Sequence, residues 1–245
     1  MENGRGLVWY RLRGLGLTCL CSLVFFIGAY LNNQKNEEVS TAVNGQRQPL
    51  YQVRTEERKV ALTFDTTGGN RCIQEILDTL AGCGVKATFF VTGEWAGSYP
   101  EELKRITEGG HDIGCFGQKY VDMTEFTKQE IKETLQISAE TVRELTGHEV
   151  RLFRAPYGKY SNEQIETAEL LGYTVIGWSI DSEDWKNYGM DSVIGKVTQS
   201  EHLENGAVIR MHGDAEDTVQ SLEAVISGLR EMGYEPVSLT ELAAF

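Results

Sequence analysis

Between Lys59 and Leu239 the sequence alternates short apolar runs with longer segments in which apolar residues recur every three or four positions. The short runs are rich in Val, Ile, Phe and Thr, which favours buried strands, whereas a three- and four-residue spacing is typical of amphipathic helices. We predict strands over residues 59–65, 86–93, 111–116, 151–157, 174–181, 207–213 and 235–239. We predict helices over residues 73–84, 100–110, 127–147, 162–172, 191–203 and 217–233.

A strand, helix, strand alternation of this kind predicts parallel strands joined by crossover helices. Such a sheet is either open or closed into a barrel, and the polar residues near the strand ends bear on the choice. Four different predicted strands end at or near a polar residue: Asp65, Arg154, Asp181 and His212. In a β/α barrel these ends gather at one face and build the active site, whereas an open sheet gathers them only near a switch point. We therefore expect an α/β fold, a distorted (β/α) barrel of about seven parallel strands.

The N-terminal part of the chain differs from the rest because no charge occurs from Gly14 to Leu31, and arginines precede this run. As a helix the run would be roughly 27 Å long, close to the hydrocarbon thickness of a bilayer. The positive-inside bias places the N-terminus in the cytoplasm. We expect residues 1–31 to form a cytoplasmic tip and signal-anchor transmembrane helix, 32–50 a flexible linker, and 51–245 the extracytoplasmic domain of a single-pass protein of the cell membrane. A cleaved signal peptide is the alternative, but the apolar run is long for one.

The chain carries a formal net charge of −13 at pH 7. A surface of this sign repels nucleic acid, so we expect no nucleic-acid partner and favour neutral or cationic ligands. The cysteines that follow the apolar run are Cys72, Cys83 and Cys115. An odd number cannot all pair, and one helix holding Cys72 and Cys83 would keep them about 16 Å apart, too far for a disulfide. We therefore expect free thiols unless Cys83 lies beyond the helix end.

Five short motifs occur in order along the predicted domain: TFDTTGG, GHDIGCFGQKY, FRAPYG, DSEDW and IRMHG. Their order and spacing resemble those of the polysaccharide deacetylases, the NodB homology domain of carbohydrate esterase family 4, over about residues 59–239. The resemblance implies a β/α barrel that removes N-acetyl groups from N-acetylglucosamine polymers such as peptidoglycan or chitin, with the help of a divalent metal such as zinc. It also implies a place in the cell envelope, with an N-acetylated glycan as the partner.

The resemblance assigns catalytic roles to four residues of this sequence. Asp65 matches the catalytic base, and Arg154 matches the arginine that holds this base through a charged hydrogen bond. His212 matches the general acid that protonates the leaving amine, because imidazole exchanges a proton near neutral pH. Asp184 matches the carboxylate that orients this histidine.

The metal site and the substrate groove are where the sequence departs from the family pattern. The family's aspartate and two histidine ligands correspond here to Thr66, Phe116 and Tyr120. A hydroxyl, a phenyl ring and a phenol are poor ligands for zinc at neutral pH, so we expect no metal ligands at these positions and no metal cofactor. Tyr157 and Trp185 match residues of the substrate groove, where the tyrosine backbone amide helps stabilise the oxyanion. Tyr120 would add aromatic surface to that groove.

Two functions follow from this pattern. The first is a polysaccharide deacetylase with an altered site, because Asp65, Arg154 and His212 are retained, although the loss of a metal removes a contribution worth several kcal/mol. The second is a catalytically inactive descendant that binds a glycan or a protein partner through the old groove. A third hypothesis, a glycosidase that uses Asp65 and Asp184 as its carboxylate pair, has no other support in the sequence.

Overall fold

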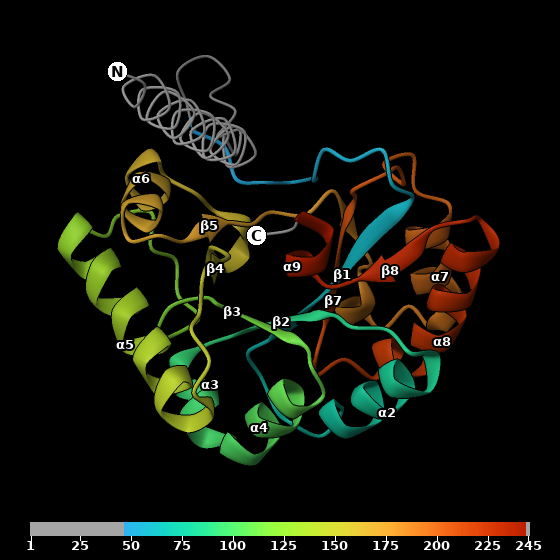
Figure 1. The fold of residues 1–245 in the computed structure, drawn as a ribbon, viewed down its shortest axis with the longest axis horizontal. Helices are drawn as coiled ribbons and strands as arrows, with labels where there is room; N and C mark the ends of the chain where they lie inside the picture. The colour runs from blue at the N-terminus through green and yellow to red at the C-terminus, as the bar shows by residue number, and fades with distance from the viewer. Residues whose placement is uncertain (1–46, 244–245) are drawn as a thin grey trace, which may run out of the picture. The chain divides into compact units, whose positions relative to one another are not determined.

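The computed structural model describes residues 47–243, which form an α/β fold around one curved parallel sheet (Figure 1). The strands are β1 Lys59–Thr66, β2 Thr88–Val91, β3 Asp112–Cys115, β4 Leu152–Phe153, β5 Thr174–Val175, β6 Ile180–Asp181, β7 Val208–His212 and β8 Glu235–Val237. The helices are α2 Ile73–Cys83, α3 Gly93–Ser98, α4 Pro100–Glu108, α5 Lys128–Thr146, α6 Asn162–Leu170, α7 Met190–Thr198, α8 Glu216–Glu231 and α9 Leu239–Ala243. Two short 3₁₀ turns, η1 Pro156–Gly158 and η2 Asp184–Lys186, follow strands β4 and β6.

Strand pairing confirms the expected parallel β/α architecture and shows how the sheet curls. The strand order is β5-β4-β3-β2-β1-β7-β6, and β8 pairs with the start of β1. All of these pairs are parallel, and the register places Asp65 beside Phe90 on one side and His212 on the other. The end of the central strand β1 is therefore flanked directly by the residue predicted as the general acid.

One predicted strand is wrong in an informative way. Residues 174–181 form two strands, β5 and β6, which lie at opposite edges of the sheet. The Ile176 amide still bonds the carbonyl of Phe153 in β4, and the Ser179 amide bonds the carbonyl of Val208 in β7. Only Gly177 and Trp178 therefore lie between the two edges, so Ile176 and Ser179 are at most about 11 Å apart and the sheet has to curl into a half-barrel.

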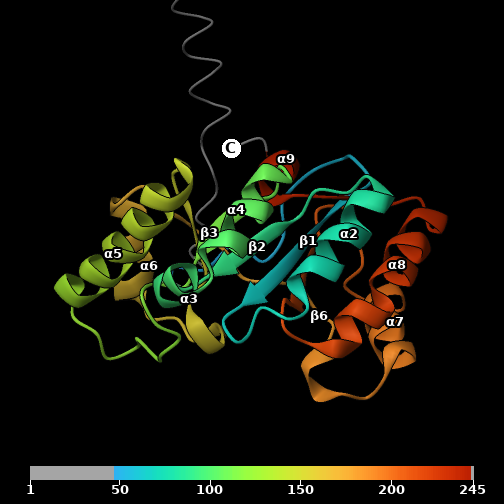
Figure 2. The same cartoon turned by 90° about the horizontal axis from the view of Figure 1, so that it is seen from below.

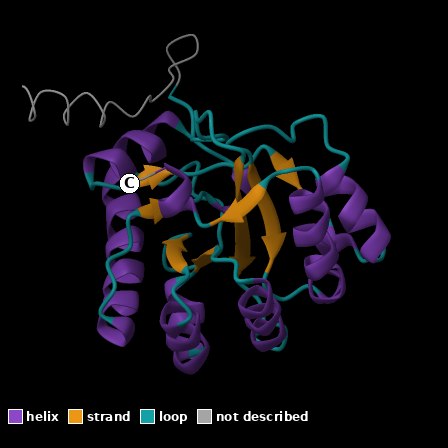
Figure 3. Cartoon of the chain, turned by 45° about the vertical axis from the view of Figure 1, so that its right-hand side comes forward, coloured by secondary structure: helices purple, strands orange, loops and turns teal. Residues whose placement is uncertain are grey.

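Alternation along the strands separates two apolar clusters. On β1, Val60, Leu62 and Phe64 point outward into the larger cluster, which the helices cover, and Figure 2 shows α2 and α4 over this face. Figure 3 shows the strands at the centre with helices on both flanks. Ala61 points inward into a smaller cluster, which α9 contacts through Leu239 and Leu242. The same period of two directs the polar residues further along β1 to the inner face at the C-terminal end of the sheet.

The predicted helices are present, with ends that their own sequences explain. Thr127 and Glu130 form a capping box at the start of α5, and Gly147 ends this helix in the left-handed conformation. Helices α3 and α9 were not predicted because each is too short to show a helical period. The predicted strand 235–239 ends earlier, at Val237, because α9 begins at Leu239.

Two predictions from the sequence concern thiols and membranes. Cys72, Cys83 and Cys115 are free in the structure, as expected. Within residues 47–243, no helix is long and apolar enough to span a bilayer. The span predicted between Gly14 and Leu31 and the boundary drawn at residue 31 lie outside the described residues. The linker predicted over residues 32–50 is described only from residue 47, so these predictions remain untested.

Candidate active site

The carboxylate of Asp65 lies near the end of β1 with only 2% of the residue exposed. Arg154, which follows β4 and is completely buried, donates from Nη1 to Asp65 Oδ1 at 2.6 Å. The same guanidinium donates to Thr63 Oγ1 and to the carbonyl of Gly177, each at 3.0 Å, and its Cζ lies 4.0 Å from the centroid of the Phe90 ring. The structure thus brings the predicted base and its arginine together as a desolvated, charge-assisted pair.

A second guanidinium, that of Arg210, faces the same carboxylate and was not singled out from the sequence. Arg210 lies in β7 beside Asp181 and donates from Nη2 to Asp181 Oδ2 at 2.9 Å. Its Nε lies 3.9 Å from Asp65 Oδ2, an ion-pair distance without a hydrogen bond, and its Cζ is 3.9 Å from the centroid of the Trp178 ring. A charged residue inside the apolar run AVIRMHG was the sequence signal that could have found it.

His212 and Asp184 form a second hydrogen-bonded pair, which becomes an ion pair when the imidazole is protonated. His212 Nδ1 lies 2.7 Å from Asp184 Oδ1, the His212 amide donates to Asp184 Oδ2 at 2.8 Å, and the Thr218 hydroxyl donates to the same oxygen. Although burial raises the pKa of Asp184, its hydrogen bonds with His212 and Thr218 and the charge of His212 bring it below the ordinary value. Burial lowers the pKa of His212, but Asp184 more than reverses this and the pKa is raised. An ionised carboxylate only accepts, so Nδ1 carries the proton and Nε2 is the atom free for proton exchange.

The three positions that hold a metal in the family are packed and mostly apolar here. Thr66 and Phe116 are completely buried, and among the described residues the Thr66 hydroxyl donates only to the carbonyl of Phe64, two positions earlier, at 3.4 Å. The Phe116 ring lies 6.0 Å from the Phe90 ring and 4.9 Å from the Tyr120 ring, centroid to centroid. Within the described residues there is no group of three or more His, Cys, Asp or Glu that could hold a metal ion. This donor set does not fit a divalent metal of the family's kind.

The hydroxyl of Tyr120 accepts a hydrogen bond from the backbone amide of Tyr157. By the family resemblance, this amide is the group that would stabilise the oxyanion. Tyr157 has φ +61°, a conformation uncommon for a residue with a side chain, and it aims its backbone N–H at the Tyr120 hydroxyl, 3.2 Å away. The Tyr157 hydroxyl donates in turn to the Tyr120 carbonyl at 3.3 Å, and the two ring centroids are 4.7 Å apart. Burial raises the pKa of the Tyr120 phenol, and the charges of Asp65 and Arg210 act on it in opposite directions. The phenol is therefore neutral and shares one electrostatic environment with both charged groups.

Exposed aromatic side chains follow the Asp184 turn. Trp185 is 52% exposed and Tyr188 69% exposed, and Lys186 Nζ lies 5.4 Å and 6.0 Å from their ring centroids. A surface hollow of about 540 Å³ is lined by residues of β6, including Asp181, and of α7. Its lining is rich in hydrogen-bonding groups and includes Ser179, Asp191, Ser192, Lys196, Gln199 and His202.

The sequence of this chain is similar to those of several known proteins. The sequence profile described as polysaccharide deacetylase matches residues 52–176. An uncharacterised 30.6 kDa protein of Geobacillus stearothermophilus is 33% identical over 194 residues, which cover 76% of this chain and 71% of that protein. A peptidoglycan-N-acetylglucosamine deacetylase of Listeria monocytogenes is 35% identical over 185 residues, 76% of this chain but only 39% of the Listeria protein. This chain thus matches well under half of the length of the Listeria enzyme.

The fold is similar to that of a solved protein from Bacillus anthracis, described as a pseudoenzyme of carbohydrate esterase family 4. The two share a TM-score of 0.76 and 29% identity over 80% of this chain and 69% of the Bacillus chain. A mutant of that pseudoenzyme, described as having restored enzymatic activity, gives a TM-score of 0.76 and 30% identity over 80% of this chain and 71% of the mutant.

Proposed function

Because this chain belongs to the polysaccharide deacetylase family, we propose that it binds an N-acetylated glycan of the cell envelope at the described centre, without hydrolysing it through a bound metal. Membership confirms the family predicted from the five motifs. The substrate class is carried over from relatives named as peptidoglycan and chitooligosaccharide deacetylases. The proposal departs from their activity because of the chemistry of this chain's own residues.

The observation that carries this proposal is the contact between Tyr120 and Tyr157. In the family, position 120 would supply an imidazole to a metal and the amide of residue 157 would stabilise an oxyanion. Here one phenol replaces the ligand and accepts the amide's hydrogen bond at 3.2 Å. A single substitution therefore removes a metal donor and occupies an oxyanion donor, two features that stabilise the transition state of amide hydrolysis. A similar fold described as a pseudoenzyme supports this interpretation.

A second candidate function, slow deacetylation without metal, rests on the intact pair of His212 and Asp184. The buried carboxylate holds His212 in one tautomer, with Nε2 free to protonate a leaving amine. Asp65, in contrast, accepts a hydrogen bond from Arg154 and is only 2% exposed, so it is poorly placed to activate a water molecule. Since Asp65 is bound to Arg154 and Asp184 to His212, the structure offers no support for a glycosidase pair.

The experiment combines binding and turnover on the full-length chain. N-acetylglucosamine oligomers and soluble peptidoglycan fragments are titrated calorimetrically, and released acetate is measured in the same samples. We expect binding with acetate at background, and weaker binding in Trp185→Ala. The matched control is Ile137→Ala, because Ile137 in α5 is an apolar side chain of nearly equal exposure, 53% against 52%. Acetate release above background would establish the second candidate, and absence of binding to every glycan tested would refute the first.

We also propose that the N-terminal apolar run anchors the chain in the cell membrane and leaves the domain outside the cytoplasm. Its support is the uncharged stretch from Gly14 to Leu31 and the arginines before it. The full-length chain should stay in the membrane pellet after extraction with alkaline carbonate. Deletion of residues 1–31 should release it, and a full-length chain found in the soluble fraction would contradict the anchor.

A further inference from the structure

Arg210 is a charged residue of the site to which the family resemblance assigns no role. Its side chain is only 10% exposed, yet it is charged and lies within β7, between Asp65 and Asp181. Its guanidinium stacks on Trp178 with Cζ 3.9 Å from the ring centroid, while Arg154 lies 5.5 Å from the same ring. The Trp178 ring therefore helps to hold the Arg210 cation in place beside the buried Asp65 carboxylate.

Asp181 alone does not account for this burial. The side chain of Asp181 is 32% exposed, so water can solvate that carboxylate without an arginine. Asp65 is in the opposite situation, because its Oδ2 is buried and accepts no hydrogen bond. Burying a charge is costly unless another charge lies nearby, so the residue that gains most from Arg210 is Asp65.

The charge of Arg210 equals what the missing metal site would have supplied. A divalent ion held by one aspartate and two neutral histidines brings a net charge of +1 to such a centre. Thr66, Phe116 and Tyr120 at those positions bring none. Arg210 brings +1, and it acts on the same phenol at position 120 as Asp65 does. The centre thereby keeps its charge balance without an ion.

We propose that Arg210 is a positioning residue that serves as the built-in counter-cation of Asp65 in place of a divalent metal. The proposal deepens the proposed function and rests on it. It has a direct consequence for restoring the family's ligands. A centre that regains an aspartate, two histidines and a metal while keeping Arg210 carries one positive charge in excess, and the metal should bind weakly.

The test compares zinc affinity in two full-length variants at fixed pH and ionic strength. The first carries Thr66→Asp, Phe116→His and Tyr120→His, and the second adds Arg210→Gln. Zinc is titrated in competition with a chromophoric chelator. We expect the second variant to bind zinc at least about tenfold more tightly, which corresponds to ~1.4 kcal/mol.

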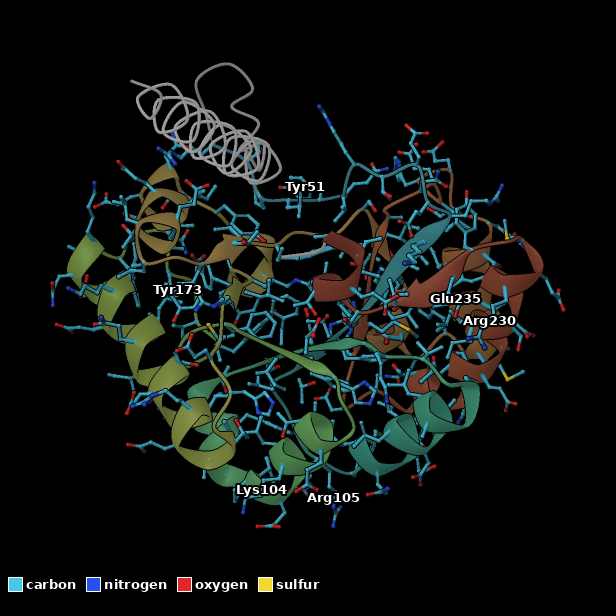
Figure 4. All side chains as sticks on the ribbon, in the orientation of Figure 1. Tyr51, Lys104, Arg105, Tyr173, Arg230 and Glu235 are labelled. Carbon is cyan, nitrogen blue, oxygen red and sulfur yellow. The ribbon has the colours of Figure 1, made fainter. Side chains whose placement is uncertain are left out.

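Two controls separate the local charge from other effects. Arg210→Lys in the same background keeps the charge but not the planar fork, and it should leave zinc affinity within about threefold of the first variant. Arg230→Gln removes a cation at a different part of the surface, where Arg230 pairs with Glu235 at 2.8 Å (Figure 4), and it should also leave zinc affinity unchanged.

A second measurement applies if the variant that adds Arg210→Gln to the three restored ligands does not fold. In the unmodified background Arg210→Gln should lower the urea midpoint, and Asp65→Asn should cost less free energy of unfolding in the Arg210→Gln background than in the unmodified chain, because Arg210 then no longer interacts with Asp65. Equal zinc affinity with and without Arg210, or strict additivity of these two substitutions, overturns the proposal. Neither outcome depends on acetate release, so failure of the inference is distinguishable from failure of the proposed function.

Discussion

Substitution of Arg154 by Met should lower the free energy of unfolding far more than substitution of a surface arginine. The Arg154 side chain is completely buried and makes three hydrogen bonds, to Asp65 at 2.6 Å and to Thr63 and Gly177 at 3.0 Å. Met fills a similar volume, so the main consequence is an Asp65 carboxylate left without its closest partner. Breaking a buried ion pair on one side typically costs about 3 to 5 kcal/mol of unfolding free energy.

A double-mutant cycle in urea, followed by tryptophan fluorescence of the full-length chain, checks this magnitude. Asp65→Asn alone should cost less than Arg154→Met, because Arg154 keeps its bonds to Thr63 and Gly177. In the double variant the two losses should fall short of additivity by about 2 kcal/mol, the coupling expected of direct contact. Arg230→Met, from an exposed pair, should cost at most about 1 kcal/mol. Strict additivity, or a loss below about 1 kcal/mol for Arg154→Met, would refute a structural role for this pair.

Three further outcomes follow from the same structure. The pKa of His212, measured by NMR, should lie above its ordinary value because of Asp184, and it should fall in Asp184→Asn. The stability that His212 contributes is therefore present below pH 6.5 and is lost as the pH rises through the raised pKa. Burial and the charge of Lys86 lower the pKa of His111 to about 4 in the folded chain. As the pH falls, His111 is therefore protonated in the unfolded chain before it is protonated in the folded chain. The free energy of unfolding should then drop by about 2 kcal/mol between pH 6.5 and pH 4, and an equal drop in His111→Gln would contradict the assignment. Thr127→Ala removes the capping box of α5 and should cost about 1 kcal/mol, whereas an unchanged urea midpoint would show that the box contributes nothing.

The sequence was sufficient for residues whose position follows from strand ends. Asp65 and His212 each lie at the end of a buried run, and parallel strands bring such ends to one edge, so their proximity needed only the strand assignment. Arg154 also follows a predicted strand, whereas Asp184 came from motif order alone, and the catalytic roles predicted for both remain predictions. The sequence therefore predicted the α/β fold class and the residues that lie near the centre of the site.

The remaining features depend on backbone details that no local pattern reports. Trp178 reaches both guanidiniums because the chain crosses between sheet edges at Gly177, which required knowing that residues 174–181 are two strands. The bond from Tyr157 to Tyr120 depends on a φ of +61° at Tyr157, which tyrosine does not favour by itself. Tertiary packing decides both features, so they became visible only in the structure.

The measurement that tests the central claim most directly is the divalent metal content of the full-length chain, purified without chelator and dialysed before elemental analysis. The variant with Thr66→Asp, Phe116→His, Tyr120→His and Arg210→Gln, loaded with excess zinc before the same dialysis, serves as the control that must retain more metal. With a hydroxyl, a phenyl ring and a phenol at the ligand positions, the unmodified chain should hold far less than one ion per molecule. Close to one tightly held ion per unmodified chain would contradict the account and restore a metal-dependent deacetylase.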